Sequence, residues 1–363
     1  MTWYADHLPG RTVHLDGAEY RYFSGTSYLG MARNEAFMDL LRAGMDRYGA
    51  NYASSRGGNL QLAVYGEAED HLAGFTGAPA ALTVSSGMLA GQLVARALPE
   101  NALLLYGPRT HPALWRRPAD NYQAPWQAWA DALPGRVAQA REKEVVILTN
   151  ALDPLQGETY DFGWLERLPA GRPVMLVVDD SHGLGVTGEE GGGIYRQLKA
   201  FPHVRPVVIA SLGKALGLPG GVILADETLL AAIRQMAFFG GASPVPPAYL
   251  HAFLRAGSLY DEARQRLGAN VAHFTRLAAP THFFRHRPGY PVFYTPANAL
   301  CDFLRERRIL ISSFPYPTPD SSHLTRVILS SLHTADDIAY LAACIKAFEK
   351  RIPEAGGRET GEE

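Results

Sequence analysis

The chain has 363 residues, of which 47% are hydrophobic and 19% are charged, and its formal net charge is −2. This length allows a large buried core and about two domains, and the mixed, nearly balanced charges favour a small-molecule partner over nucleic acid or a membrane surface. No apolar run reaches the roughly 18 residues that cross a bilayer, and residues 1–17 do not resemble a signal peptide, so we expect a cytoplasmic protein. Cys301 and Cys344 lack metal-ligand spacing, so we expect neither a disulfide framework nor a metal site.

The hydrophobic pattern divides the chain into four parts. Residues 1–35 predict an N-terminal arm with a strand-like segment, EYRYFSG. In residues 36–255, helical stretches alternate with apolar runs such as VVILTN and VMLVVDD, a pattern typical of strands buried on both faces of a mainly parallel sheet. Residues 256–350, with a long helix followed by PVFYTP, ILISSF, TRVILSS and a last helix, predict a smaller α+β domain, and residues 351–363 predict a disordered tail. The fold class is therefore α/β with a second, smaller domain.

Two glycine-containing segments look like nucleotide-binding motifs. The stretch VMLVVDDSHGLGVTG, residues 174–188, ends in G-x-G-x-x-G, but a dinucleotide-binding turn needs these glycines to open a helix directly after the strand. Here DDSH intervenes and EEGGG, a poor start for a helix, follows. The second segment, GKALG at 213–217, lacks the first glycine and the final Ser or Thr of a phosphate loop. Both patterns disfavour a nucleotide site.

Polar residues stand at the ends of two predicted strands. Asp179 and His182 follow one apolar run, and Lys214 follows the next. Ligands of open parallel sheets bind beyond the carboxyl ends of the strands, so these side chains are expected to share one crevice. Pyridoxal phosphate (PLP) chemistry requires a lysine that holds the aldehyde as a Schiff base and a carboxylate that keeps the pyridine nitrogen protonated. The sequence therefore predicts a PLP site.

The same region resembles a known family. VDDSHGLGVTGEEGGG followed by ASLGKALGLPGG is similar to the signature of the α-oxoamine synthases, which are fold-type I PLP-dependent enzymes of the aminotransferase class I/II superfamily. The likeness continues through YGANYASSRGGNLQLAVYGEAEDHLAGFTG, SSGMLAGQ, RTHPALW, ASPVPPA and TRVILSSLHT in the family's order, over about residues 20–350. The resemblance implies a PLP-dependent transferase with a mainly parallel, seven-stranded sheet and a homodimer with shared active sites.

The resemblance assigns four catalytic residues. Lys214 matches the Schiff-base lysine, and Asp179 matches the carboxylate that pairs with the pyridinium. His182 matches the imidazole near the cofactor's ring oxygen, and His111 matches the histidine that stacks on the cofactor face. Considered alone, these side chains would equally suit a surface lysine, a turn cap and two ordinary loop histidines.

Five further residues are expected to hold the phosphate of PLP. Ser86, Gly87 and Met88 follow the strand ALTVS and open a helix, so their N–H groups and the helix dipole can bind an anion. By resemblance, Ser211 adds a hydroxyl, and Ser243 adds one that the family supplies from the neighbouring subunit. The alternative is that these are ordinary turn serines.

Two arginines match arginines of the family. Arg326 matches the one that binds the substrate carboxylate, a task that suits a planar, permanently charged fork. The alternative for Arg326 is a surface arginine at a strand edge. Arg56 matches a residue whose role is substrate-side or structural.

The chain departs from the family at three positions. Where the family has Asn before Tyr-Leu-Gly, this chain offers Thr26 and Ser27, and Asn150 and Pro154 stand where it has an acidic residue and Ser. Proline has no hydroxyl to offer a cofactor. We therefore expect the cofactor anchoring to be retained and the recognition of substrate to be altered.

The implied reaction is the decarboxylative condensation of a small amino acid with an acyl-CoA or another acyl thioester, which yields an α-amino ketone with Lys214 as the general base. One alternative is transamination or another α-carbon reaction, because a shared scaffold does not fix the reaction. A second alternative is a PLP-binding protein that does not catalyse.

Overall fold

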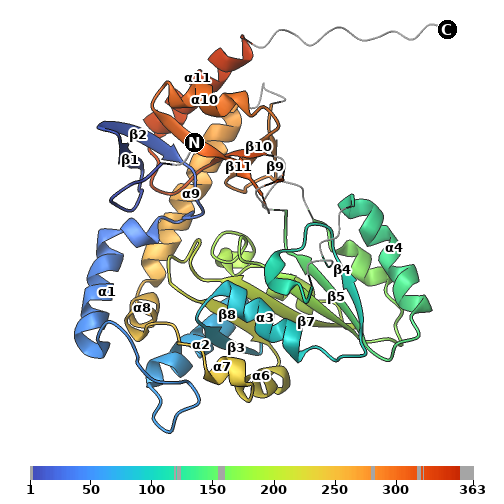
Figure 1. The fold of residues 1–363 in the computed structure, drawn as a ribbon. Coiled ribbons are helices and arrows are strands. Elements are labelled where there is room, and N and C mark those ends of the chain that lie inside the picture. Colours follow the sequence, from blue (N-terminus) through green and yellow to red (C-terminus); the bar gives the residue numbers. More distant parts are fainter. Residues whose placement is uncertain are drawn as a thin grey trace, which may run out of the picture. The chain divides into compact units, whose positions relative to one another are not determined.

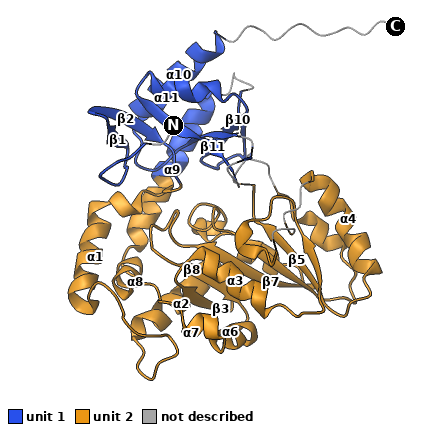
Figure 2. Ribbon diagram, viewed as in Figure 1, with its two compact units in different colours: residues 1–25, 155–157, 266–363 blue, residues 26–154, 158–265 orange. Residues whose placement is uncertain are grey.

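The chain forms two compact units in the computed structural model (Figures 1 and 2). The smaller unit comprises the described residues of 1–25 and 266–363, and the larger unit comprises those of 26–154 and 158–265. The predicted domain boundaries after residues 35 and 255 remain predictions, and only Arg351 of the predicted tail is described. The structure describes residues 3–117, 120, 124–153, 160–278, 283–316, 320–321 and 323–351.

The larger unit is built on a sheet with the strand order β3-β8-β7-β6-β5-β4. Its strands are β3 (Ala80–Val84), β4 (Leu103–Tyr106), β5 (Val145–Asn150), β6 (Val174–Asp179), β7 (Val204–Ser211) and β8 (Gly221–Ala225). Strands β4 to β7 are parallel, and β8 runs antiparallel to both β7 and β3. All strands except β8 therefore end at the same edge of the sheet. The predicted α/β class is confirmed; the described residues contribute six strands to this sheet, where the resemblance implies seven.

Helices flank the sheet of the larger unit (Figure 1). Strand residues Val177, Ile209 and Ile223 are 0% exposed, as the continuous apolar runs predict, and they share one core with Leu93 and Val94 of α3. Burying each such side chain stabilises the fold by about 1.5–3 kcal/mol. The helices are α1 (Glu35–Tyr48), α2 (Ala63–Thr76), α3 (Gly87–Ala97), α4 (Trp126–Gln139), α5 (Tyr195–Lys199), α6 (Glu227–Arg234), α7 (Ala237–Gly240) and α8 (Pro247–Phe253), with 3-10 turns at Met31–Arg33, Pro112–Leu114, Gly163–Arg167 and Glu189–Gly191.

The smaller unit has its own sheet, with the order β1-β2-β11-β12-β10-β9. Residues 19–23 of the predicted segment EYRYFSG lie in β2, which pairs in parallel with β11, so that Tyr22 lies opposite Leu310. The stretch HAFLRAGSLYDEARQRLGANVAHFTRLA, residues 251–278, predicts one long helix, but the structure divides it: α8 ends at Phe253 and α9 begins at Gly257. The elements of this unit are β1 (Thr12–Leu15), β2 (Ala18–Phe23), β9 (Arg285–His286), β10 (Val292–Thr295), α10 (Ala299–Arg305), β11 (Ile309–Pro315), β12 (His323–Ile328) and α11 (Ala335–Glu349). The helix α9 (Gly257–Ala278) belongs to the larger unit up to residue 265 and to the smaller unit from residue 266.

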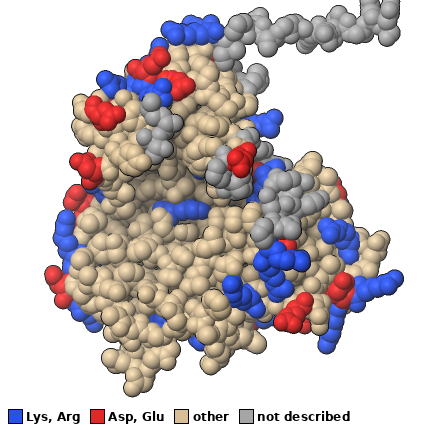
Figure 3. Space-filling model, viewed as in Figure 1, with Lys and Arg blue, Asp and Glu red and all other residues tan. Residues whose placement is uncertain are grey.

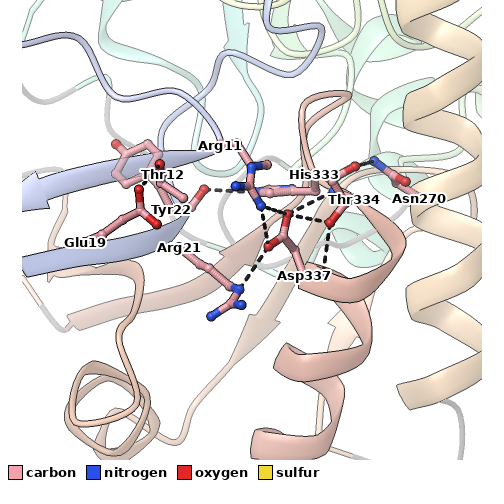
Figure 4. A network of polar contacts seen from close by, with 9 residues as sticks. All are labelled: Arg11, Thr12, Glu19, Arg21, Tyr22, Asn270, His333, Thr334 and Asp337. Atoms are coloured by element: carbon pink, nitrogen blue, oxygen red, sulfur yellow. Dashed lines mark hydrogen bonds and ion pairs between the residues drawn. The ribbon is translucent and has the colours of Figure 1, made fainter.

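A polar network anchors the start of α11 within the smaller unit (Figure 4). Thr334 and Asp337 form a capping box, in which each side chain accepts a hydrogen bond from the other residue's backbone N–H. The Asp337 carboxylate, 1% exposed, also accepts hydrogen bonds from Arg11 and Arg21. Burial alone would raise the pKa of Asp337, but the hydrogen bonds from Thr334, Arg11 and Arg21 together hold it below the ordinary value. The network thereby ties β1 and β2 to the last helix.

His333 is a buried member of the same network. Its ring stacks on Phe23 with the centroids 4.0 Å apart, and its Nδ1 accepts a hydrogen bond from the Ser330 N–H at 3.0 Å. Its Nε2 lies 3.0 Å from the Tyr22 carbonyl oxygen, which requires a proton on Nε2. Burial lowers the pKa of His333 to about 4. The imidazole is therefore neutral and has one tautomer in the folded protein at neutral pH.

The segment DDSHGLGVTG leaves β6 in turns, and the next regular element is the 3-10 turn Glu189–Gly191. No helix opens on its glycines. Gly185 and Gly188 have φ values of +88° and +77°, and a Cβ on Gly188 would lie 2.2 Å from the Gly193 carbonyl oxygen. The glycines thus allow a tight backbone turn and close packing.

None of the described helices is both long and apolar enough to traverse a bilayer.

Candidate active site

Asp179 is the last residue of β6 and is 7% exposed. Its Oδ1 accepts a hydrogen bond from the Ser181 N–H at 2.9 Å, and its Oδ2 lies 3.4 Å from Nδ1 of His111. Because strands β4 to β7 are parallel, the residues that follow them lie at one edge of the sheet, as the sequence predicts. The hydrogen bond from the Ser181 N–H therefore orients the carboxylate at this edge of the sheet.

His111 follows β4 and caps the 3-10 turn Pro112–Leu114. Its Nδ1 accepts a hydrogen bond from the Ala113 N–H at 3.2 Å, a bond that requires Nδ1 to carry no proton. Burial lowers the pKa of His111; the Asp179 carboxylate opposes this shift, and the Lys214 ammonium adds to it. The imidazole is accordingly neutral at pH 7 and lies within electrostatic reach of both Asp179 and Lys214.

Lys214 is half-buried in the return between β7 and β8. The Leu212 N–H donates to the Gly220 carbonyl at 3.0 Å, and the Leu218 N–H donates to the Leu212 carbonyl at 3.0 Å. These backbone hydrogen bonds close the return on both sides of the lysine. Lys214 is thus carried by an ordered segment at the same edge of the sheet as Asp179.

His182 follows β6 and is half-buried. Its Nδ1 lies 2.7 Å from the hydroxyl oxygen of Tyr28, a residue that is 0% exposed. Sequence reasoning missed Tyr28, because it lies far from His182 in the chain and no local pattern distinguishes it from a core tyrosine. The structure adds Tyr28 to the candidate site.

The start of α3 packs tightly against the ends of β7 and β8. Ser86 is the N-cap, and its Oγ accepts a hydrogen bond from the Leu89 N–H at 3.0 Å. A Cβ on Gly87 would lie 2.9 Å from Cβ of Ser211, and a Cβ on Gly221 would lie 2.4 Å from the carbonyl carbon of Ser86. The first-turn amides of Gly87 and Met88 are therefore close to Ser211. A helix N-terminus beside a serine hydroxyl suits an anion such as a phosphate.

Ser211 is fixed from the other side by Ser181, whose Oγ accepts a hydrogen bond from the Ser211 N–H at 2.8 Å. Ser181 also donates its N–H to Asp179, so it links the carboxylate to the phosphate-binding end of the site. Sequence reasoning singled out Ser211 and missed this linking role of Ser181. The set of a buried carboxylate, a lysine, an imidazole and a helix N-terminus fits PLP.

Ser243 and Arg326 are the remaining residues that the resemblance assigns to the site. Ser243 is exposed in the loop between α7 and α8 of the larger unit. Arg326 belongs to β12 of the smaller unit, where it pairs in register with Tyr294 and Ser312. It is 7% exposed, and its guanidinium lies 6.0 Å from the ring centroid of Phe314. A buried strand position excludes the alternative of a surface arginine.

Arg56 has a structural environment. Its Nη1 and Nη2 donate to the two carboxylate oxygens of Glu69 at 2.9 and 3.1 Å, and its guanidinium lies 4.3 Å from the ring centroid of Tyr65. Glu69 also accepts hydrogen bonds from the backbone N–H and the hydroxyl of Thr83 in β3. Of the two roles that the sequence left open for Arg56, these contacts support the structural one.

Thr26, Asn150 and Pro154, at which the chain departs from the family pattern, lie in different parts of the chain. Thr26 precedes Tyr28 in a turn, and its carbonyl accepts a hydrogen bond from the Tyr28 N–H at 2.9 Å. Asn150 ends β5 and lies opposite Asp179 in the register of the sheet. Pro154 lies outside the described residues.

The smaller unit also contains a cavity of about 580 Å³. Its wall includes the apolar side chains of Trp3, Val13 and Leu310 and the ion pair of Asp302 with Arg305. None of the residues predicted to act on the cofactor or substrate lines it. The cavity therefore shares no lining residue with the candidate site.

Comparisons with known proteins agree with this geometry. The family model described as aminotransferase class I and II matches residues 24–345. The 8-amino-7-oxononanoate synthase of Methylococcus capsulatus is 31% identical over 94% of this chain and 92% of its own length. The serine palmitoyltransferase of S. paucimobilis with bound PLP–myriocin has a TM-score of 0.81 at 16% identity, over 96% of this chain and 92% of that one. The 8-amino-7-oxononanoate synthase of Francisella tularensis has a TM-score of 0.68 at 21% identity. This match covers 91% of this chain and 98% of that one.

Proposed function

Because the chain belongs to the aminotransferase class I and II family and is an α-oxoamine synthase-like, PLP-dependent transferase, we propose that it condenses a small amino acid with an acyl thioester. The reaction joins the amino acid's α-carbon to the acyl carbonyl carbon, releases carbon dioxide and the free thiol, and leaves an α-amino ketone. The observation that carries this proposal is the 31% identity to an 8-amino-7-oxononanoate synthase over 94% of the chain.

The chemistry that bound PLP supplies is the stabilisation of negative charge at the α-carbon of the amino acid. We propose that Asp179 holds a proton on the pyridine nitrogen, a role supported by its burial and by the fixed orientation of its carboxylate. Lys214 would hold the aldehyde carbon and would move the proton at the α-carbon. The neutral His111 imidazole lies beside Asp179 and provides a flat, uncharged surface for the ring.

The phosphate is proposed to bind at the start of α3. The N–H groups of Gly87 and Met88 point along the helix axis with the positive end of its dipole, and the hydroxyl of Ser211 lies beside them. Ser86 stabilises this turn as the N-cap. Arg326 is proposed to bind the substrate carboxylate through its guanidinium fork.

We propose that the protein is a homodimer in which Ser243 acts at the partner's site. The face of the larger unit that carries α2 and α7 has few charged side chains in Figure 3. Leu60, Met88 and Phe238 of this unit are 69%, 49% and 57% exposed, which is unusual for large apolar residues and typical of an interface. Light scattering should give twice the chain mass, and Phe238→Asp should shift the protein toward monomer. A wild-type monomer at micromolar concentration would contradict the dimer.

The cytoplasm is the proposed location. Cys301 and Cys344 are free cysteines, which suits a reducing compartment. Cell fractionation checks this location.

The proposed reaction is tested with purified protein loaded with PLP. Glycine, alanine and serine are supplied one at a time, with and without acyl-CoA thioesters of different chain length. We expect release of free thiol and of carbon dioxide in equal amounts, only when amino acid and thioester are both present, and no release from the Lys214→Ala variant.

Two outcomes would replace the proposal. Conversion of the cofactor to pyridoxamine phosphate with release of a keto acid would identify an aminotransferase. A cofactor spectrum that responds to no amino acid would identify a PLP-binding protein that does not catalyse.

A further inference from the structure

The backbone on both sides of Thr110 is held by one side chain. Oδ1 of Asn150 accepts a hydrogen bond from the His111 N–H at 3.0 Å, and Nδ2 of Asn150 donates to the Arg109 carbonyl at 2.8 Å. Asn150 is itself 6% exposed and ends β5. Because β5 is an interior strand of the sheet, these two bonds fasten the segment before His111 to a rigid support.

Arg109 needs this support because its backbone is strained. Its φ is +51°, in the left-handed region that residues with a side chain rarely adopt. Its guanidinium is held as well, since Nε and Nη2 each lie 2.9 Å from Oδ2 of Asp153, a carboxylate that is 1% exposed. Asn150 thus fixes the backbone of Arg109 while Asp153 fixes its side chain.

The start of the segment is pressed against the same strand. The Gly107 N–H donates to the Leu148 carbonyl at 2.7 Å, and a Cβ on Gly107 would lie 2.7 Å from Oγ1 of Thr149. Thr110 closes the turn, because its hydroxyl donates to the Gly107 carbonyl at 2.7 Å. Residues 107–111 therefore form an ordered turn whose last residue, His111, has little freedom to move.

We propose that Asn150 is a positioning residue for the reaction: by bridging Arg109 and His111 it sets the His111 imidazole beside Asp179. The inference rests on the proposed function at one point, namely that the positioned His111 ring contacts the ring of PLP. It gives a role to a position at which the chain departs from the acidic residue of the related family.

An amide suits this position better than a carboxylate of the same shape. A carboxylate could accept from the His111 N–H, but it has no donor for the Arg109 carbonyl. It would also place a second negative charge opposite Asp179 in the register of the sheet. Two carboxylates on neighbouring strands would disfavour each other's ionised form. The added negative charge would also favour protonation of His111. Asn150 orients the turn without either electrostatic effect.

The experiment compares Asn150→Asp and Asn150→Ala with the matched control Asn270→Ala. Nδ2 of Asn270 also bridges two carbonyls, those of Ser330 and His333, at 2.9 Å each, but in the smaller unit. The first readout is the pKa of the His111 imidazole in protein without PLP, followed by NMR and assigned with His111→Gln. The second readout is the dissociation constant of PLP.

In the wild type the His111 pKa should lie below the ordinary value, because the ring is buried. We expect Asn150→Ala to raise it by admitting water and Asn150→Asp to raise it further, while Asn270→Ala leaves it unchanged. Loss of a residue that supports a metal ligand weakens metal binding roughly 10- to 100-fold, and by analogy we expect the dissociation constant of PLP to rise about tenfold or more in both Asn150 variants. The isosteric Asn150→Asp retains the bond to the His111 N–H and keeps the test valid if Asn150→Ala does not fold.

A folded Asn150→Asp with the wild-type His111 pKa and PLP affinity would overturn the proposal. An equal effect of Asn270→Ala would do the same, because it would show a general loss of stability. If the His111 pKa shifts as expected but the wild type neither binds PLP nor releases thiol, the positioning role stands and the proposed function fails. If the wild type condenses its substrates while the His111 pKa is the same in all variants, the proposed function stands and the positioning role fails.

Discussion

The hydroxyl oxygen of Tyr28 lies 2.7 Å from Nδ1 of His182, and Tyr28 is fully buried. The two rings are tilted by 55° with centroids 6.1 Å apart, so the contact is made through the hydroxyl and not by stacking. A bond to one ring nitrogen fixes the orientation of the imidazole and therefore the direction of Nε2. Tyr28 thus determines how His182 is presented at the site edge.

Tyr28→Phe removes this hydrogen bond and keeps the packing of the ring. Leaving a polar group without its partner costs about 1–3 kcal/mol, so we expect kcat/KM of the condensation to fall roughly tenfold to a hundredfold. The melting temperature should fall by only a few degrees, because one hydrogen bond is lost while the apolar part of the ring is retained. Steady-state kinetics and thermal unfolding check both expectations, and unchanged kinetics would show that His182 needs no support from Tyr28.

Lys214→Ala should eliminate the visible absorbance that PLP acquires when it is bound covalently to the protein. The phosphate-binding end of the site is intact in this variant, so PLP should still bind, more weakly and reversibly. Absorbance spectra before and after dialysis distinguish the two states. Lys199→Ala is the control, since Lys199 lies in α5 and not at the site edge. A visible band that persists in Lys214→Ala would mean that another residue binds the cofactor.

Gly87→Ala should weaken PLP binding. The added Cβ would lie 2.9 Å from Cβ and 3.0 Å from Cα of Ser211, so the helix start must move away from that serine. We expect the dissociation constant of PLP to rise by about tenfold, the effect of losing one or two good hydrogen bonds. Gly66→Ala in α2 is the matched control, because nothing lies within 4 Å of its Cβ position. Equal PLP affinity in the two variants would show that phosphate does not bind at this helix start.

His333 should make the stability of the protein depend on pH in a defined window. The pKa of His333 is about 4 in the folded protein and about 6.5 in the unfolded chain. Between pH 4 and 6.5, His333 is therefore protonated in the unfolded chain and neutral in the folded protein. The contribution is fully present above pH 6.5 and is lost as the pH falls toward 4, by roughly 3 kcal/mol in total. His333→Gln should be less stable at pH 7 but should lose less stability between pH 6.5 and 4. Urea unfolding at several pH values checks this, and parallel profiles would contradict it.

The strand-end residues show what could be predicted from the sequence. Asp179 and Lys214 follow apolar runs, and the parallel arrangement of buried strands requires their ends to meet at one edge, as the structure confirms for the sheet. The start of α3 at Gly87 was predictable for the same reason, because a polar residue after a strand and before a helical pattern marks an N-cap. Local pattern and one rule of sheet architecture suffice for these positions.

Other features depend on contacts that no local pattern encodes. The role of Tyr28 depends on its contact with His182, which lies far along the chain. The role of Asn150 depends on its hydrogen bond to the turn that ends at His111. In the smaller unit, β2 pairs in parallel with β11. The sequence predicts a strand in the N-terminal segment, but it does not predict which strand pairs with it. The assignments of Ser243 and Arg326 to cofactor and substrate rest on resemblance and stay predictions.

The reversed direction of β8 determines how Lys214 can move. A crossover to a parallel strand would have placed the lysine on a long connection, whereas here the chain turns back into β8, and hydrogen bonds that join Leu212 to Gly220 and to Leu218 close the turn. Because the backbone of the turn is held by these hydrogen bonds, the freedom that remains to the Lys214 amine is rotation about the bonds of its own four-carbon side chain.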